Sequence, residues 1–290
     1  MTVLVTGATG STGSAAAAAL VQQGAPVRAL VRGPDRAALL PAGVEAVFGD
    51  LRDPAAVEAA LTGVTAALYV SPHEPDEERL AETFVAACER LGVRLVFAGV
   101  VTDSVFLRAL VGVMLPHYRG KLRIARRIAR SSARPVLFSV TNFYQNDELV
   151  REDILAGTYP LPVHGSGVNR IDLRDVGDLV ARALTEPQFP GGIHALCGPA
   201  SVGGAEAAQT WTQVLGRPVR YAPEEWQAAS ARRLSGHKLV DFRKSYGFLA
   251  RRGMPTSARD VARMTALLGR APRPYGDYVR DMAEAWQAVS

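Results

Sequence analysis

The first half of the chain alternates short apolar runs with segments of helical periodicity. We expect strands at residues 2–6, 27–31, 46–48, 66–70 and 94–98, and helices at residues 14–23, 36–40, 54–61 and 77–91. Runs such as VLV, ALYV and LVF are apolar at every position, which is typical of strands covered on both faces. Strands that alternate with helices of this length indicate βαβ units and a parallel sheet.

The alternation loosens after residue 140. Residues 142–167 carry Pro and Gly without a strong period, and no stretch is long enough to be a linker between independent domains. Further on, the pattern predicts helices at 175–184 and 204–215, and short strands at 193–196 and 219–221. From residue 222 onward it predicts helices with scattered aromatic residues.

Composition narrows the class of protein. The 290 residues include 48% hydrophobic residues, and no apolar run approaches the ~18–20 residues of a membrane span. The chain opens on MTVLVTGATG, with neither the basic n-region nor the cleavage site of a secretion signal. Cys88 and Cys197 form no metal-binding pattern. We expect a cytoplasmic protein with neither a metal nor a membrane partner.

A glycine-rich loop follows the first predicted strand and precedes the first predicted helix. Its glycines allow a tight turn and a close approach of the backbone to a pyrophosphate, and the helix N-terminus attracts the phosphates. The residues expected to bind the dinucleotide here are Gly7, Thr9, Gly10, Ser11, Thr12 and Gly13. A loop that binds no ligand is the alternative.

The end of the second predicted strand indicates which dinucleotide binds. Enzymes that use NAD place an acid there to bind the ribose, whereas this chain has Arg32, with Arg36 nearby. An arginine pairs with a 2′-phosphate, so we predict NADP(H), with an exposed surface arginine as the alternative. Asp50, beside Leu51, follows the third strand and is placed to bind the adenine, or else to serve as a turn carboxylate.

Several segments together resemble a known family, the NmrA-like atypical short-chain dehydrogenases/reductases. They are VLVTGATGSTG at 3–13, VRALVR at 27–32, GDLRD at 49–53, SVTNFYQN at 139–146 and IDLRDVGDLVARALTEP at 171–187. The resemblance implies a Rossmann-type, doubly wound parallel α/β sheet with a smaller C-terminal substrate-binding lobe. We assign residues 1–150 to the NADP-binding core. Residues 151–290 are a mixed region that completes the core and forms a mostly helical substrate lobe.

The chain departs from the family at the usual catalytic residues. Typical short-chain dehydrogenases use a serine, a tyrosine and a lysine, with the tyrosine four residues before the lysine. Here Lys121 is preceded at that spacing by His117, and Gly99 aligns with the serine. Lysine is rare among the 33 basic residues, the other two being Lys238 and Lys244.

Helical geometry places Lys121 and His117 on one apolar face with Ile124 and Ile128. Five arginines take the opposite face, which we interpret as solvated rather than as a nucleic-acid surface. A lysine on a buried face needs an anion, which the cofactor ribose or a substrate oxyanion would provide. We therefore predict Lys121 and His117 as catalytic residues. A lysine that extends to solvent and a histidine in the pocket wall are the alternatives.

The ends of the other strands supply the remaining candidates. Val70, Ser71 and Pro72 should pass under the cofactor, and Gly99 and Lys121 are further candidates for binding it. Ligands of open α/β sheets lie outside the carboxyl ends of the strands. The backbone at Thr141, Asn142 and Phe143 should therefore meet the nicotinamide, and Asn142 or Tyr144 the substrate.

The leading hypothesis is an NADPH-dependent reductase that transfers hydride to a ketone or quinone, as a monomer or a homodimer. Without the tyrosine, the proton would come from His117, from water or from a substrate hydroxyl. The aromatic residues of the C-terminal lobe favour an aromatic polyketide, as for the ketoreductases of angucycline pathways such as simocyclinone. A dinucleotide-sensing regulator and a sugar-nucleotide epimerase are the alternatives.

Overall fold

The computed structural model describes residues 2–102 and 111–288. They form two compact units, the first from Met1–Val140 and Leu173–Leu196, the second from Thr141–Asp172 and Cys197–Ser290. The chain leaves the first unit after residue 140 rather than 150, because Asn142 pairs with a strand of the second unit. Residues 173–196 are the part of the later sequence that completes the first unit.

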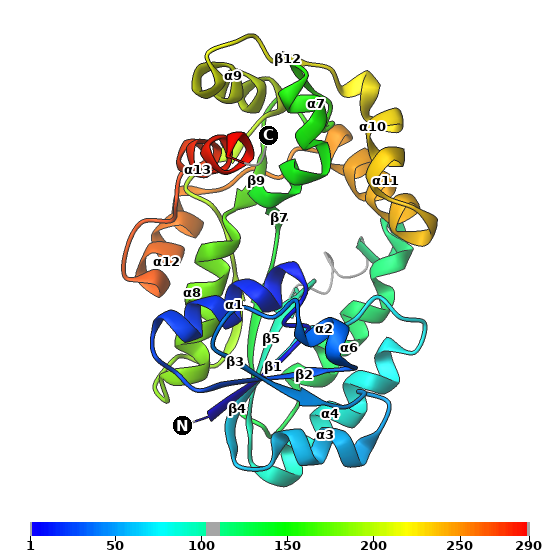
Figure 1. Ribbon diagram of the computed structural model, residues 1–290, viewed down its shortest axis with the longest axis vertical. Helices are drawn as coiled ribbons and strands as arrows, with labels where there is room; N and C mark the ends of the chain where they lie inside the picture. Colours follow the sequence, from blue (N-terminus) through cyan, green and yellow to red (C-terminus); the bar gives the residue numbers. More distant parts are fainter. Residues whose placement is uncertain (1, 103–110, 289–290) are drawn as a thin grey trace. The chain divides into compact units, whose positions relative to one another are not determined.

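The first unit is built on a seven-stranded sheet in the order β10-β6-β5-β4-β1-β2-β3 (Figure 1). All neighbouring strands pair in parallel. The order reverses between β1 and β4, which is the point where open sheets of this kind bind ligands. The predicted doubly wound α/β fold is therefore confirmed. The strands are β1 (Thr2–Thr6), β2 (Val27–Val31), β3 (Val44–Phe48), β4 (Val64–Tyr69), β5 (Arg94–Gly99), β6 (Val136–Ser139) and β10 (Gly192–Ala195).

Helices cover both faces of this sheet (Figure 1). One layer contains α1 (Ser11–Gln22) and α8 (Leu173–Thr185), and the other contains α3 (Pro54–Leu61), α4 (Glu77–Leu91) and α6 (Arg119–Ala129). Two short pieces, α2 (Pro34–Ala37) and the 3-10 turn η1 (Pro116–Tyr118), lie in the connections. The apolar faces of the second layer bury Val57, Phe84 and Ile128 against the sheet.

The predicted helices at 54–61 and 77–91 match the structure residue for residue. Pro54 stands in the first turn of α3, and Gly92 ends α4 in the left-handed conformation that favours glycine. The first helix begins at Ser11 rather than residue 14, directly after the glycine loop. The predicted strands at 46–48 and 66–70 begin earlier, at Val44 and Val64.

The second unit contains two small sheets with helices around them. Strands β7 (Asn142–Phe143), β9 (Val168–Ile171) and β11 (Ser201–Val202) form one, and β8 (Thr158–Tyr159) and β12 (Arg220–Tyr221) form the other. The helices are α7 (Arg151–Leu155), α9 (Gly204–Leu215), α10 (Trp226–Arg233), α11 (Gly236–Arg251), α12 (Ala258–Leu268) and α13 (Tyr275–Gln287), with 3-10 turns η2 (Tyr144–Val150) and η3 (Pro223–Glu225).

Aromatic side chains form the core of the second unit. The rings of Trp211 and Trp286 stack with their centroids 4.8 Å apart, and Tyr144 packs against Tyr275 and Tyr278. All five belong to one buried cluster. These aromatic residues therefore stabilise the unit itself, and their number does not indicate an aromatic substrate.

The described residues contain neither a candidate membrane span nor a candidate metal-ion cluster. Residues 2–102 and 111–288 contain no helix with the length and hydropathy needed to cross a membrane. The same residues contain no group of three His, Cys, Asp or Glu side chains that could hold a metal ion.

Candidate active site

The glycine loop turns sharply from β1 into α1. The amide of Gly10 donates to the carbonyl of Gly7 at 2.9 Å, and α1 begins at Ser11. A Cβ atom on Gly13 would lie 2.1 Å from the Gly7 oxygen, so only glycine allows the helix to approach the loop this closely. Gly10, at the start of the helix, has no side chain to cap its first amides. The loop therefore fits a pyrophosphate held by the helix N-terminus.

Thr6 holds the loop beside the end of β4. Its hydroxyl donates to the carbonyl of Leu68 at 3.2 Å and accepts from the amide of Val70 at 2.9 Å. A Cβ on Gly7 would lie 3.2 Å from the Cβ of Val70. The loop and Val70 thus lie together where the strand order reverses. Contact of Val70, Ser71 and Pro72 with a cofactor stays a prediction.

The residues expected near the adenine end have exposed side chains and acidic neighbours. Arg32 directly follows β2, its side chain is 57% exposed, and its guanidinium lies 3.9 Å from the carboxylate of Glu74. Asp50 accepts from the amide of Arg52 at 2.8 Å, which is the geometry of a turn carboxylate. Arg52 in turn pairs with Asp76 at 2.9 Å. Asp50 therefore has the turn role, while adenine binding by Asp50 and Leu51 stays a prediction.

Lys121 lies on the buried face of α6, as predicted, but it meets a carboxylate of the protein. Its ammonium donates to Oε2 of Glu77 at 2.7 Å, and the two side chains are 9% and 13% exposed. The hydroxyl of Ser71 donates to the same oxygen at 3.0 Å. Glu77 is the first residue of α4. It therefore joins two predicted cofactor contacts, Ser71 and Lys121, and sequence reasoning missed it.

Tyr69 lies next to this group, at the end of β4, and is fully buried. Burial raises the pKa of its phenol, and the charge of Glu77 raises it further. A phenol with a raised pKa gives up its proton reluctantly. Tyr69 is therefore poorly suited to replace the missing tyrosine as an acid.

The predicted helix around Lys121 is partly wrong. α6 begins at Arg119, and His117 lies before it in the 3-10 turn η1 with its ring 4.2 Å from that of Tyr118. Because a 3-10 turn has a different period, helical spacing does not place His117 on the face of Lys121. A catalytic role for His117 stays a prediction.

The arginine face of α6 is solvated, as predicted: four of its five arginines are exposed and Arg127 is half-buried. Arg123 pairs with Glu78, and Arg127 pairs with Glu82 and Glu89, all at 2.5 to 2.9 Å. These contacts tie α6 to α4. Two of the five arginines on this face therefore also hold α6 against a neighbouring helix.

Gly99, aligned with the family serine, is the last residue of β5. A Cβ there would lie 2.6 Å from Cζ of Phe97, whose side chain is buried in the core. A serine at this position would have to displace that ring. The packing of Phe97 thus explains in physical terms why glycine stands here.

Asn142 and its neighbours belong to the second unit. The amide of Asn142 donates to the hydroxyl of Tyr246 at 3.3 Å, and its oxygen accepts from Nε of Arg170 at 3.0 Å. Thr141 donates to the carbonyl of Asn169 at 2.8 Å. Tyr144 is fully buried and packs in the aromatic core, so its side chain offers no surface to a substrate.

Arg170 is held by Asp147 in a fully buried ion pair of the second unit. The guanidinium and the carboxylate lie 2.7 Å apart and are 1% and 0% exposed. The hydroxyl of Tyr159 also donates to Asp147 at 2.9 Å, and burial raises the pKa of that phenol well above its usual value. This network orients Asn142 through Nε of Arg170.

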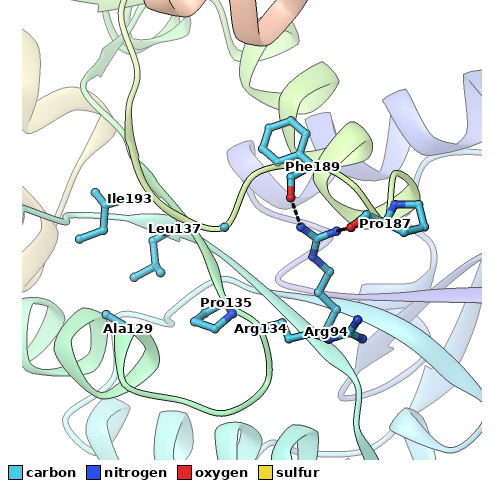
Figure 2. A pocket seen from close by; sticks show the side chains of 10 residues that line it. Arg94, Ala129, Arg134, Pro135, Leu137, Pro187, Phe189 and Ile193 are labelled. Atoms are coloured by element: carbon cyan, nitrogen blue, oxygen red, sulfur yellow. Dashed lines mark hydrogen bonds between the residues drawn. The ribbon is translucent and has the colours of Figure 1, made fainter.

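The structure also contains a cavity of about 690 Å³ at the other end of the main sheet (Figure 2). It is lined from the starts of β5, β6 and β10 by residues including Arg94, Pro135 and Gly192. Arg94 is 8% exposed and donates to the carbonyls of Glu186, Pro187 and Phe189. Since Arg94 anchors the turn after α8 and ligands of such sheets bind at the carboxyl ends, we place no catalysis in this cavity.

Known proteins are similar to this chain over most of its length. It is 30% identical over 295 residues to the (4-alkanoyl-5-oxo-2,5-dihydrofuran-3-yl)methyl phosphate reductase of Streptomyces griseus subsp. griseus, covering 98% of this chain and 99% of that protein. It is 30% identical over 224 residues to the NAD(P)H azoreductase of Xenophilus azovorans, covering 76% of each.

A solved structure shares the fold. The NADPH-dependent quinone oxidoreductase of Escherichia coli, complexed with NADPH, superposes with a TM-score of 0.77 at 20% identity, covering 97% of this chain and 99% of that one. The model of the NmrA-like family matches residues 1–230. With the glycine loop at the point where the strand order reverses, these findings show that the chain belongs to the NmrA-like family.

Proposed function

We propose that this protein is an NADPH-dependent reductase that transfers hydride to a ketone or quinone carbonyl of a small molecule. The observation that carries the proposal is the glycine loop, which meets Val70 where the strand order reverses, close to the start of α1. That arrangement is suited to a dinucleotide pyrophosphate. The names of two relatives, a reductase and an NAD(P)H azoreductase, support the same chemistry.

Arg32 accounts for the preference for NADPH. The residue directly after β2 is a cation rather than the acid that binds the ribose of NAD. Its 57% exposed side chain can turn from Glu74, 3.9 Å away, toward a 2′-phosphate. Phosphate forms charge-assisted and bidentate hydrogen bonds with arginine.

NADPH, when bound, would supply hydride for the carbonyl carbon, and the carbonyl oxygen would then need a proton to become a hydroxyl. Lys121 donates hydrogen bonds at this end of the sheet, either to the ribose or to the carbonyl oxygen, where negative charge develops. Asn142 and the backbone of Thr141 and Phe143 remain the proposed contacts of the nicotinamide and the substrate. The proton comes from His117, from water or from the substrate.

The absence of the usual serine and tyrosine favours a substrate that assists its own reduction. A phenol next to the ketone can donate to the developing oxyanion, as in hydroxylated aromatic polyketides. We therefore propose an aromatic hydroxyketone or quinone, and a role in the biosynthesis of such compounds. The buried aromatic core of the second unit gives no support to this choice of substrate. The choice depends only on the need for a proton donor in place of the missing tyrosine.

The test is NADPH oxidation followed by absorbance, with a quinone and with a hydroxylated anthracyclic ketone as separate acceptors. We expect turnover with at least one, and a slower rate when the adjacent phenol is methylated. Tight NADPH binding without turnover of either acceptor would overturn the proposal and favour a dinucleotide-sensing regulator.

Arg32→Ala tests the cofactor assignment. Loss of a charge-assisted hydrogen bond costs about 1.5–3 kcal/mol, so the Kd for NADPH should rise about ten- to hundredfold while that for NADH stays within about twofold. Arg90→Ala removes an exposed arginine that pairs with Glu58 and is the matched control. Equal weakening of both cofactors would place the specificity elsewhere.

A further inference from the structure

Two adjacent glutamates at the start of α4 pair with two basic residues of α6, but in different surroundings. Glu78 pairs with Arg123, and their side chains are 46% and 61% exposed. Glu77 pairs with Lys121, and theirs are 13% and 9% exposed. The outer pair faces solvent and the inner pair faces the end of the sheet. The outer pair and the pairs of Arg127 with Glu82 and Glu89 already link the two helices. The buried inner pair therefore calls for a further explanation.

The packing around Glu77 is shaped to admit a carboxylate. A Cβ atom on Gly120 would lie 2.5 Å from Oε1 of Glu77, so glycine leaves the room that this oxygen occupies. The other oxygen, Oε2, accepts from both Lys121 and Ser71, at 2.7 and 3.0 Å. One carboxylate thereby fixes two side chains that come from different segments of the first unit.

The pair leaves part of the lysine available. An ammonium carries three N–H groups, and among the residues that the structure describes Lys121 donates to one partner, Glu77. The remaining donors suit ribose hydroxyls or a carbonyl oxygen. Because Glu77 balances the charge, Lys121 acts there as an oriented donor more than as an uncompensated cation.

We propose that Glu77 is the positioning residue of the reductase site, which orients Lys121 and Ser71 for the cofactor and the reacting carbonyl. This inference deepens the proposed function and rests on it. Glu77 itself touches neither the cofactor nor the substrate. It restricts the lysine to one rotamer, as a supporting shell does for a reactive group.

The kinetic test compares Glu77→Gln with Glu78→Gln. Both variants remove a negative charge from the first turn of the same helix, so they share any effect on helix stability. Displacing a reacting group by about 1 Å costs on the order of hundredfold. We expect Glu77→Gln to lower kcat about 10- to 100-fold, with the Kd for NADPH changed less than about threefold. Glu78→Gln should match the wild type, and Glu77→Asp should recover part of kcat.

A spectroscopic readout tests the geometry without turnover. The chain has three lysines, and Lys238 and Lys244 are exposed. In 15N-lysine protein, an ammonium held in a buried ion pair exchanges its protons slowly with water and gives an NMR signal. We expect this signal from Lys121 in the wild type and in Glu78→Gln, its loss in Glu77→Gln, and a shift when NADPH is added.

The outcomes separate this inference from the proposed function. If the wild type turns over no acceptor, the proposed function fails while the ammonium signal still reports on Glu77. If Glu77→Gln keeps the wild-type kcat, or lowers kcat while the Lys121 signal persists, Glu77 does not act through Lys121 and the inference is overturned.

Discussion

Each unit of this protein contains a buried ion pair, and these two pairs have the same length but different surroundings. The cation and the carboxylate lie 2.7 Å apart in both Arg170–Asp147 and Lys121–Glu77. The first is fully buried, whereas the side chains of the second retain 9% and 13% exposure. The difference indicates which pair holds a structure together and which is open to a ligand.

The guanidinium of Arg170 is surrounded by hydrogen-bond partners and aromatic rings of the second unit. It donates to the side chains of Asn142, Tyr159 and Asp147 and to two backbone carbonyls, and it lies over the rings of two tyrosines. Asp147 also accepts from Tyr275 and Trp211. A network satisfied to this extent specifies one packing of the core. Within residues 2–102 and 111–288, Lys121 donates to Glu77 alone, so N–H groups remain for a ligand.

The largest effect on stability should come from breaking the fully buried pair, Arg170–Asp147. Arg170→Met leaves the carboxylate of Asp147 buried without its cation, and such changes cost about 3–5 kcal/mol. We expect this loss in the free energy of unfolding, measured by denaturant. Arg220→Met, at an exposed pair with Glu224, is the control and should leave stability nearly unchanged. A loss below about 1 kcal/mol for Arg170→Met would mean that the network is not structural.

The second prediction removes both charges of the other pair. In the Lys121→Met/Glu77→Gln variant no buried charge is left alone, so the free energy of unfolding should stay within about 1–2 kcal/mol of the wild type. The activity should nevertheless fall about hundredfold, as expected when an oriented donor is lost. Unfolding curves and kcat/KM measure the two effects. If the Lys121→Met/Glu77→Gln variant were as unstable as Arg170→Met, the Lys121–Glu77 pair would have the same structural role as Arg170–Asp147.

Sequence patterns predicted the elements that local chemistry determines. The helix at 77–91 could be read from its apolar period and from Gly92 at its end, and both limits are correct. The glycine loop could also be placed from the sequence, because the strand, the turn and the helix follow each other directly along the chain. The sheet order then follows from the connection rules of βαβ units.

The same patterns could not identify the partner of Lys121. Glu77 lies 44 residues away, and in the sequence it looks the same as Glu78, its neighbour. Only the packing of α4 against α6 buries one and exposes the other. The interpretation of the aromatic residues after 222 as a sign of an aromatic substrate fails for a related reason. Periodicity does not distinguish a side chain that fills a core from one that lines a pocket.

A third pair extends the comparison to the surface and should give the smallest effect. The hydrogen bond from Arg127 lowers the pKa of Glu89 to about 2, below the ~4.3 of an unfolded glutamate. The stabilisation is therefore present above that pH and is lost as the pH falls from about 4.3 toward 2. At 32% and 25% exposure, the pair should contribute less than about 1 kcal/mol. Glu89→Gln should lower the Tm slightly at neutral pH, with the difference narrowing in acid. Glu58→Gln, at the exposed pair with Arg90, is the control, and a pH-independent difference would contradict the assignment.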